Sequence, residues 1–202
     1  ELLSNRLKSL QSILKQLGPC KRKSVRFNDE SAEILWAGDC AIVVEFGRLK
    51  SKNVMEGWLN HLCLCSIDKL PKATLVIARN NSRLKENDYN VVIQWERIPS
   101  DKAKEELEKL NSIADHGLIF CWPIPPESGW ALAQASQKDQ NQGIKAFKQK
   151  WEGSFNLSGE SNKIEMQLCF GRNFNYNNFL NNESFRKAYD YLYKPLIRGL
   201  II

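Results

Sequence analysis

Two carboxylates flank an apolar run in the segment GDCAIVVEFGRLKSK, residues 38–52. Metal-dependent nucleases use such carboxylates to hold a hard cation beside a lysine, and here Asp39 precedes the run and Glu45 follows it. The position two residues after Glu45, where that lysine is expected, is Gly47. On a regular strand both acids point to the same face. Because the lysine is missing, we expect Asp39 and Glu45 to be solvated or ion-paired residues at the strand ends.

An active metal-dependent nuclease stays open as an alternative. In that case Asp39 and Glu45 are the metal ligands, and Lys50 or Lys52 acts as a displaced lysine. Lys50 lies beyond Gly47, so a bulge or turn would have to return its ammonium group to the carboxylates. The position of the nearest lysine relative to the two acids distinguishes an active site from an inactive one.

A second set of metal-binding side chains lies in NVMEGWLNHLCLCS, residues 53–66, which contains His61, Cys63 and Cys65. The apolar spacing predicts a helix, on which positions 61 and 65 share a face and position 63 does not. A zinc site also needs a fourth ligand, and the sequence has no second Cys/His cluster. We therefore expect a buried helix face made of Met55, Trp58, Leu59, Leu62 and Cys65.

Other catalytic signatures are absent from the sequence. It has no Gly-rich phosphate loop, no G-x-S-x-G elbow and no Cys–His dyad signature, so we expect neither catalytic residues nor a cofactor. The six cysteines lie mostly in apolar runs without a CxxC pair, which indicates a reduced, cytoplasmic protein. No apolar run approaches the roughly 20 residues that span a bilayer, and no signal peptide is visible. Most of the six tryptophans lie in apolar periodic segments and are expected in the core.

Positive charge is concentrated in the first part of the chain. Residues 1–85 contain 15 Lys and Arg against 8 Asp and Glu, whereas residues 86–202 contain 14 against 15. Such a region attracts acidic partners such as nucleic acid, although a solvated basic surface has the same composition. If DNA binds, we expect sequence-independent contacts from Lys21, Arg22, Lys23, Arg48, Lys50, Lys52, Arg79, Arg83 and Lys85.

The elements that position these residues follow from apolar spacing and from Pro and Gly signals. A leucine stripe predicts a first helix that ends at Gly18-Pro19, with Leu3, Leu7, Leu10, Leu14 and Leu17 on one face. Strands are expected at 24–27, 33–36, 40–46, 73–79 and 90–98, the last two forming a hairpin. A helix is expected from a cap at Ser100 or Asp101 to Gly117.

The remainder, residues 118–202, is expected to be mainly helical, with helices at 129–136, 144–153 and 184–197. We expect a loop and a strand within 154–171 and a loop at 173–182. This order predicts an α/β or α+β fold in which helices flank a central mixed sheet. We expect an N-terminal helix and basic linker at 1–23 and the main domain at 24–202. The start at Glu1 rather than Met suggests a fragment of a longer protein.

Four segments resemble, in the same order, the C-terminal domain of RecC, the gamma subunit of exodeoxyribonuclease V in the RecBCD complex. They are WLNHLCLCS (58–66), LIFCWPIPPESGWALA (118–133), KAFKQKWEG with SGESNKIEMQLCFG (within 145–171), and SFRKAYDYLYKPLI (184–197). The resemblance extends over most of residues 30–200. Each motif alone is weakly specific, and their shared order is moderately specific.

The resemblance implies a fold similar to the PD-(D/E)xK nucleases that has lost its catalytic residues. AIVVEF would be the strand that carries the acid-x-lysine pair in active relatives, with Gly47 in place of the lysine. Asp39 and Glu45 would then be vestigial, although residual metal binding by them stays open. The implied function is DNA binding and strand separation in double-strand-break repair and recombination. The implied partners are DNA and RecB-like and RecD-like helicase subunits, without a membrane.

The two ends of the chain carry more apolar surface than a small monomer usually exposes. Part of this surface is expected to face another subunit, including Tyr193 on the closing helix. The opposing interpretation is that both ends fold back onto the domain's own core. A purely structural interaction domain that never touches nucleic acid also remains open, and scattered rather than contiguous basic side chains would favour it.

Overall fold

The structure is a computed structural model that describes residues 2–27, 30–67, 71–79, 88–119, 122–155 and 157–198. The chain forms two compact units that divide between Glu108 and Lys109. The division expected after residue 23 stays a prediction. Within the described ranges, no helix has the combination of length and hydropathy that crossing a bilayer requires.

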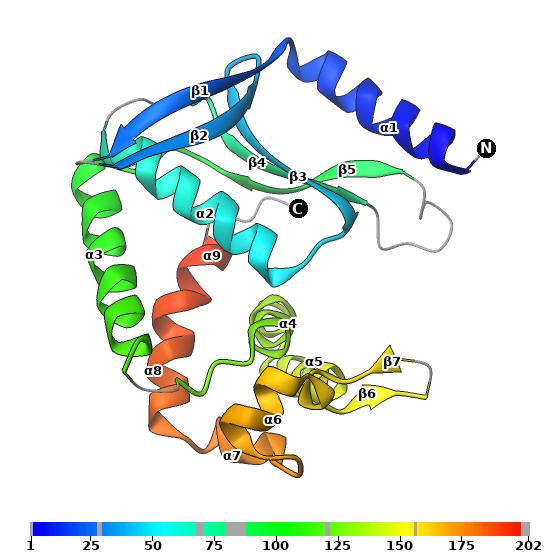
Figure 1. Ribbon diagram of the computed structural model, residues 1–202, viewed down its shortest axis with the longest axis vertical. Coiled ribbons are helices and arrows are strands. Elements are labelled where there is room, and N and C mark those ends of the chain that lie inside the picture. Colours follow the sequence, from blue (N-terminus) through cyan, green and yellow to red (C-terminus); the bar gives the residue numbers. More distant parts are fainter. Residues whose placement is uncertain are drawn as a thin grey trace. The chain divides into compact units, whose positions relative to one another are not determined.

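The first unit contains a five-stranded sheet in the order β1-β2-β3-β4-β5 (Figure 1). The strands are β1 (Cys20–Phe27), β2 (Glu30–Ala37), β3 (Cys40–Arg48), β4 (Thr74–Arg79) and β5 (Tyr89–Trp95). The pair β3 and β4 is parallel, and the other neighbours are antiparallel. Helix α2 (Ser51–Ser66) makes the crossover that a parallel pair requires. The expected mixed sheet with flanking helices, an α+β fold, is confirmed, as is the antiparallel pairing of the last two strands.

Helices α1 (Leu2–Leu17) and α2 cover opposite faces of this sheet. Successive residues of a strand point to opposite faces of the sheet, so Ala41 and Ile42 contact different helices. Ile42 packs in a cluster with Leu10 of α1, whereas Ala41 packs in a cluster with Leu64 of α2. Each face is therefore shielded by one helix, and the functional side chains must lie at the edges and ends of the strands.

Two elements of the first unit differ from the sequence prediction. Strand β1 begins at Cys20 instead of residue 24, because it pairs with β2 along its whole length. The basic triplet therefore lies within an outermost strand, a position where charged side chains are common. The leucine stripe of α1 divides: Leu10 is buried, whereas Leu3 is 69% and Leu7 is 45% exposed.

The second unit is helical apart from a two-stranded hairpin, β6 (Gly153–Ser154) and β7 (Leu157–Ser158). Helix α3 (Ser100–Gly117) spans the division between Glu108 and Lys109 and begins at Ser100, so neither residue proposed as its cap precedes it. The other helices are α4 (Pro126–Ser136), α5 (Gln140–Glu152), α6 (Ile164–Phe170), α7 (Tyr176–Leu180), α8 (Glu183–Leu192) and α9 (Lys194–Arg198), with a 3-10 turn η2 at Glu160–Asn162. Their core is an aromatic cluster around Phe147, Trp151, Phe179 and Phe185.

Three predictions for this unit are wrong. The strand expected within 154–171 is helix α6, which places Met166 and Phe170, four residues apart, against the aromatic core. The expected loop at 173–182 contains α7, capped by the side chain of Asn175. The closing helix divides at Tyr193, which is 4% exposed and not a surface residue. A Cβ atom at Gly129 would lie 2.6 Å from the Tyr193 ring, which shows how closely α4 packs on it.

Candidate functional site

The two candidate metal ligands lie at opposite ends of β3. Asp39 is exposed in the turn before the strand, and Glu45 is half-buried near its end. Six strand residues at about 3.3 Å each separate the two positions by about 20 Å. Carboxylates that share a divalent cation each lie within about 2.0–2.6 Å of it. The structure therefore does not bring Asp39 and Glu45 together. Among the described residues, no group of three or more His, Cys, Asp and Glu could hold a metal ion.

The Glu45 carboxylate instead binds the backbone at the position of the missing lysine. The Gly47 N–H donates to Glu45 Oε1 at 2.8 Å. A Cβ atom at position 47 would lie 3.1 Å from the same oxygen, so a lysine there would press on this carboxylate. Glu45 fixes the end of β3 and is not arranged beside a lysine.

The two lysines of the active-nuclease alternative lie near only one of the acids. Lys50 is the N-cap residue of α2, and Lys52 lies in its first turn, both exposed. They follow the end of β3 that carries Glu45, while Asp39 is at the far end. The two carboxylates and the lysine of an active nuclease must converge on one metal ion and one water molecule, and here they are spread along β3.

Four cations meet where the parallel strands end. Arg48 closes β3, Arg79 closes β4, and the two are direct neighbours in the sheet register. Lys50 and Lys52 follow at the start of α2, whose first turn has no acidic residue to offset the positive end of its dipole. We call Arg48, Lys50, Lys52 and Arg79 the sheet-end cluster.

The sheet-end cluster retains capacity for a negatively charged ligand. Arg79 Nε is shielded from solvent and has no hydrogen-bond partner in the part of the chain that the structure describes. Among the described residues at this end of the sheet, the acids are Glu45, which accepts a hydrogen bond from Gly47, and Asp88, which precedes β5. Cations therefore outnumber acids among the described residues at this sheet end, and oxyanions rather than divalent cations are the ligands that this charge favours.

The basic triplet of β1 forms a separate and divided group. Lys21 and Lys23 pair with Trp36 and Ile34 on the α2 face of the sheet, whereas Arg22 points to the other face. Lys23 Nζ lies 3.4 Å from the Trp36 ring centroid, and Arg22 makes an exposed 3.5 Å ion pair with Glu33. Trp36 in turn pairs with Ala41, so the triplet lies level with the start of β3. It is remote from the sheet-end cluster. Arg83 and Lys85 lie outside the described residues.

A family model of the RecC C-terminal domain matches residues 6–137, well over half of the chain. The chain belongs to the RecC C-terminal domain family. This is a family of RecBCD-type subunits, and the predicted resemblance is confirmed. The matched range contains α1 from Arg6 onward, the whole sheet, α2 and the sheet-end cluster. No curated protein matches the chain.

In this RecC C-terminal domain, His61 is a core residue. It is 1% exposed, its Nδ1 lies 3.1 Å from Thr74 Oγ1, and its ring stacks on Trp58 and Trp95 at 5.5 and 6.2 Å. Burial lowers the His61 pKa to about 4, an effect that a hydrogen bond to the Glu96 backbone partly offsets. Cys65 Sγ lies 3.7 Å from His61 Nε2. These contacts are those of a packed helix face.

The rest of the α2 prediction is confirmed with two exceptions, Met55, which is only half-buried, and Leu59. Cys63 lies on another side of the helix from His61, and burial raises the pKa of its thiol to about 11. An unreactive thiol results, because the thiolate is the nucleophilic form. Trp58 and Leu62 are buried as expected, but Leu59 is 37% exposed.

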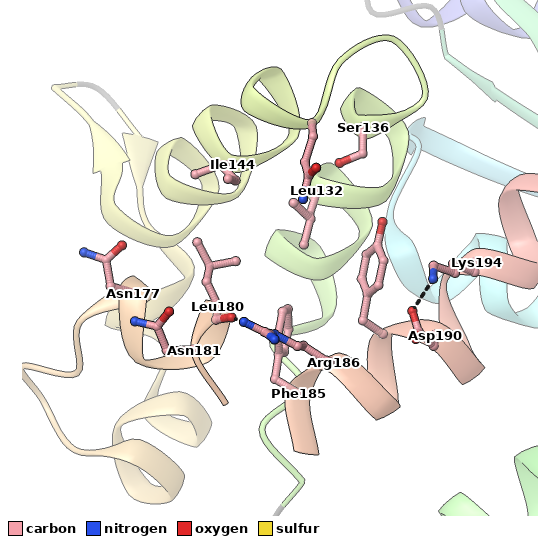
Figure 2. A pocket seen from close by; sticks show the side chains of 12 residues that line it. Leu132, Ser136, Ile144, Asn177, Leu180, Asn181, Phe185, Arg186, Asp190 and Lys194 are labelled. Atoms are coloured by element: carbon pink, nitrogen blue, oxygen red, sulfur yellow. Dashed lines mark hydrogen bonds and ion pairs between the residues drawn. The ribbon is translucent and has the colours of Figure 1, made fainter. Parts of the chain in front are cut away.

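The second unit contains a groove that the sequence did not reveal (Figure 2). Its volume is about 860 Å³, and its apolar lining includes Leu132, Ile144 and Leu180. On the rim, Lys194 Nζ lies 2.7 Å from Asp190 Oδ1. These lining residues come from α4, α5, α7, α8 and α9, and no single segment signals their convergence. The groove offers apolar surface rather than a reactive side chain.

Proposed function

We propose that this chain is a non-catalytic, nuclease-like domain of a RecC-type subunit that binds the DNA backbone through the sheet-end cluster. It would contribute to strand separation in a helicase–nuclease complex that repairs double-strand breaks. The observation that carries the proposal is the convergence of Arg48, Lys50, Lys52 and Arg79 at one end of the sheet.

Phosphate binding follows from the chemistry of these groups. Arg and Lys contacts to phosphate release condensed counterions, which makes binding sequence-independent and strongly salt-dependent. The positive end of α2 adds to the same field. The lack of catalysis follows from Gly47 and from the separation of Asp39 and Glu45 along β3. Of the nine residues predicted to contact DNA, the sheet-end cluster provides the primary contacts in this proposal, and the β1 triplet provides at most secondary ones.

The proposal predicts how neutralising the cluster changes DNA binding. We expect the chain to bind forked DNA at low salt with a dissociation constant on the order of 10⁻⁴–10⁻⁶ M. In the triple variant Arg48→Ala, Lys50→Ala and Lys52→Ala, the slope of log affinity against log salt should fall by about two to three. Each lost phosphate contact removes about 0.7–0.9 from that slope. Fluorescence anisotropy across a salt series measures it.

A matched control removes the same charge elsewhere. Lys145, Lys148 and Lys150 are exposed lysines of α5, and their replacement by alanine should leave the slope nearly unchanged. An equal loss in both triple variants would mean that only net charge matters. A wild-type chain that binds no DNA at low salt would favour the purely structural interaction domain.

We also propose that exposed leucines of α1 contact another part of the helicase–nuclease complex, such as a RecD-like subunit. Leu2, Leu3 and Leu7 are 52%, 69% and 45% exposed, an apolar surface on one helix that water does not favour. In the whole subunit, Leu3→Glu with Leu7→Glu should reduce co-purification of the helicase partners at least about tenfold. Burying an unpaired charge in such an interface costs several kcal/mol.

Ser4 is exposed on the same helix, and Ser4→Glu is the control for added charge. It should leave co-purification intact. Retention of both partners by the double leucine variant would show that α1 is not the interface.

A further inference from the structure

Phe46 is an exposed aromatic residue directly beside the sheet-end cluster. Its side chain is 68% exposed near the end of β3, and Arg48, Lys50 and Lys52 follow within six residues. Single exposed apolar residues are common on protein surfaces and need no explanation by themselves. The combination of an exposed ring with adjacent cations is less ordinary, because it is the chemistry with which proteins bind single-stranded nucleic acid.

The backbone around Phe46 is held on both sides. The Tyr89 hydroxyl donates to the Phe46 carbonyl at 2.8 Å, and the Gly47 N–H donates to Glu45 Oε1 at 2.8 Å. Tyr89 is itself fixed, since it is 5% exposed and its N–H donates to Ser9 Oγ at 2.9 Å. A ring on a fixed backbone loses little conformational entropy when a ligand stacks on it.

We infer that Phe46 is a base-stacking platform and that the sheet end selects single-stranded DNA, with Arg48, Lys50, Lys52 and Arg79 on the flanking phosphates. This inference rests on the proposed function and adds the form of DNA to it. An unpaired base presents its π face to Phe46, whereas a base inside a duplex is already stacked on its neighbours. The hydrogen bond from the Gly47 N–H to the Glu45 carboxylate then has a function, which is to hold the backbone on both sides of Phe46.

Phe155 provides a natural comparison. It is fully exposed in the hairpin turn between β6 and β7, but residues 153–158, GSFNLS, carry no charge. An exposed ring without neighbouring cations can offer stacking but cannot hold the phosphates. We therefore expect Phe155 to be irrelevant to DNA binding, which makes it the matched control for Phe46.

The test compares the wild-type chain with Phe46→Ala, Phe46→Trp and Phe155→Ala. Each is titrated with a thymidine oligomer, the same oligomer made abasic at its centre, and a duplex of equal length. Loss of one stacked base weakens binding about 5- to 150-fold. Phe46→Ala should show such a loss for the thymidine oligomer, with duplex affinity and salt slope unchanged. Phe46→Trp should bind at least as tightly as wild type, and Phe155→Ala should match it.

The results separate failure of this inference from failure of the proposed function. Equal weakening of single-stranded and duplex binding by Phe46→Ala, or no weakening, would overturn the stacking inference while DNA binding stands. A wild-type chain that binds neither DNA form at low salt would overturn both. Unchanged thermal unfolding of Phe46→Ala shows that any loss of binding is not a loss of fold.

Discussion

Replacing Glu160 with alanine is expected to lower the free energy of unfolding of the second unit by about 3–5 kcal/mol, the cost of removing one partner from a buried, hydrogen-bonded charge. Glu160 is 3% exposed, and its carboxylate satisfies the start of α4. It accepts hydrogen bonds from Glu127 N at 3.0 Å, Ser128 N at 2.7 Å and Ser128 Oγ at 2.7 Å. Without it, the two Ser128 donors stay buried and unpaired at a helix terminus that favours negative charge.

Urea denaturation of the chain measures this loss. Glu160→Gln keeps an acceptor oxygen but loses the charge, so its destabilisation should be smaller than that of Glu160→Ala. Glu165 is exposed on α6, and Glu165→Ala should change the free energy by less than about 0.5 kcal/mol. If Glu160→Ala unfolds at the same urea concentration as wild type, the carboxylate does not hold α4.

Acid should destabilise the first unit through His61. Its pKa is about 4 in the folded chain, where burial disfavours the charged ring, against the ordinary 6.5 in the unfolded chain. Between these values the unfolded state binds more protons, so the free energy of unfolding falls as pH falls from 6.5 to 4. At about 1.4 kcal/mol per unit of pKa difference, the total loss is about 3 kcal/mol.

Other groups also titrate between pH 6.5 and 4, so the contribution of His61 is measured as the difference in free energy of unfolding between wild type and a variant without this histidine. The free energy of unfolding of wild type minus that of His61→Gln should decrease by about 3 kcal/mol between pH 6.5 and 4, because glutamine does not titrate. Parallel curves for wild type and His61→Gln would contradict a buried neutral imidazole.

Local apolar patterns were enough to predict the sheet and the buried side of α2. Strand β3 is a run of Ile and Val bounded by polar residues, and β4 and β5 are separated by a polar loop, so period and punctuation identify them. The helical spacing argued against a metal site at His61, Cys63 and Cys65, because position 63 does not share the face of positions 61 and 65. The cap prediction for α3 failed because the Ser100 hydroxyl donates to the Ser66 backbone oxygen, a tertiary contact outside any local pattern.

The candidate site can be predicted from the sequence only in part. The separation of Asp39 and Glu45 can be predicted from the sequence, because the rise along a strand puts residues six positions apart at a distance of about 20 Å. Their position on the same face of the strand does not bring them together. The sheet-end cluster could not be predicted as a group, because its formation depends on the strand register that places Arg48 beside Arg79. The exposure of Phe46 was equally hidden, because a strand pattern does not show where a flanking helix stops covering it.

In the second unit, helix and strand were confused where the apolar spacing fits both. In the segment IEMQLCF, residues 164–170, apolar and polar residues alternate over the first five positions, as in a strand. Its apolar residues also recur at a spacing of four, as in a helix, so only packing on the aromatic core decides between strand and helix. Met166 and Phe170 pack on that core in the helical arrangement. The groove lined by α4, α5, α7, α8 and α9 arises from such packing and has no local signature.

We propose that this RecC C-terminal domain binds DNA without cutting it, and one gel tests this proposal most directly. Forked DNA is incubated with the chain and magnesium or manganese, and the DNA length is read under denaturing conditions after binding has been confirmed on a native gel. We predict bound, intact DNA for wild type and for Gly47→Lys, because a restored lysine still lacks the second carboxylate beside Glu45. Metal-dependent cutting by the wild-type chain that disappears in Asp39→Ala would contradict the account.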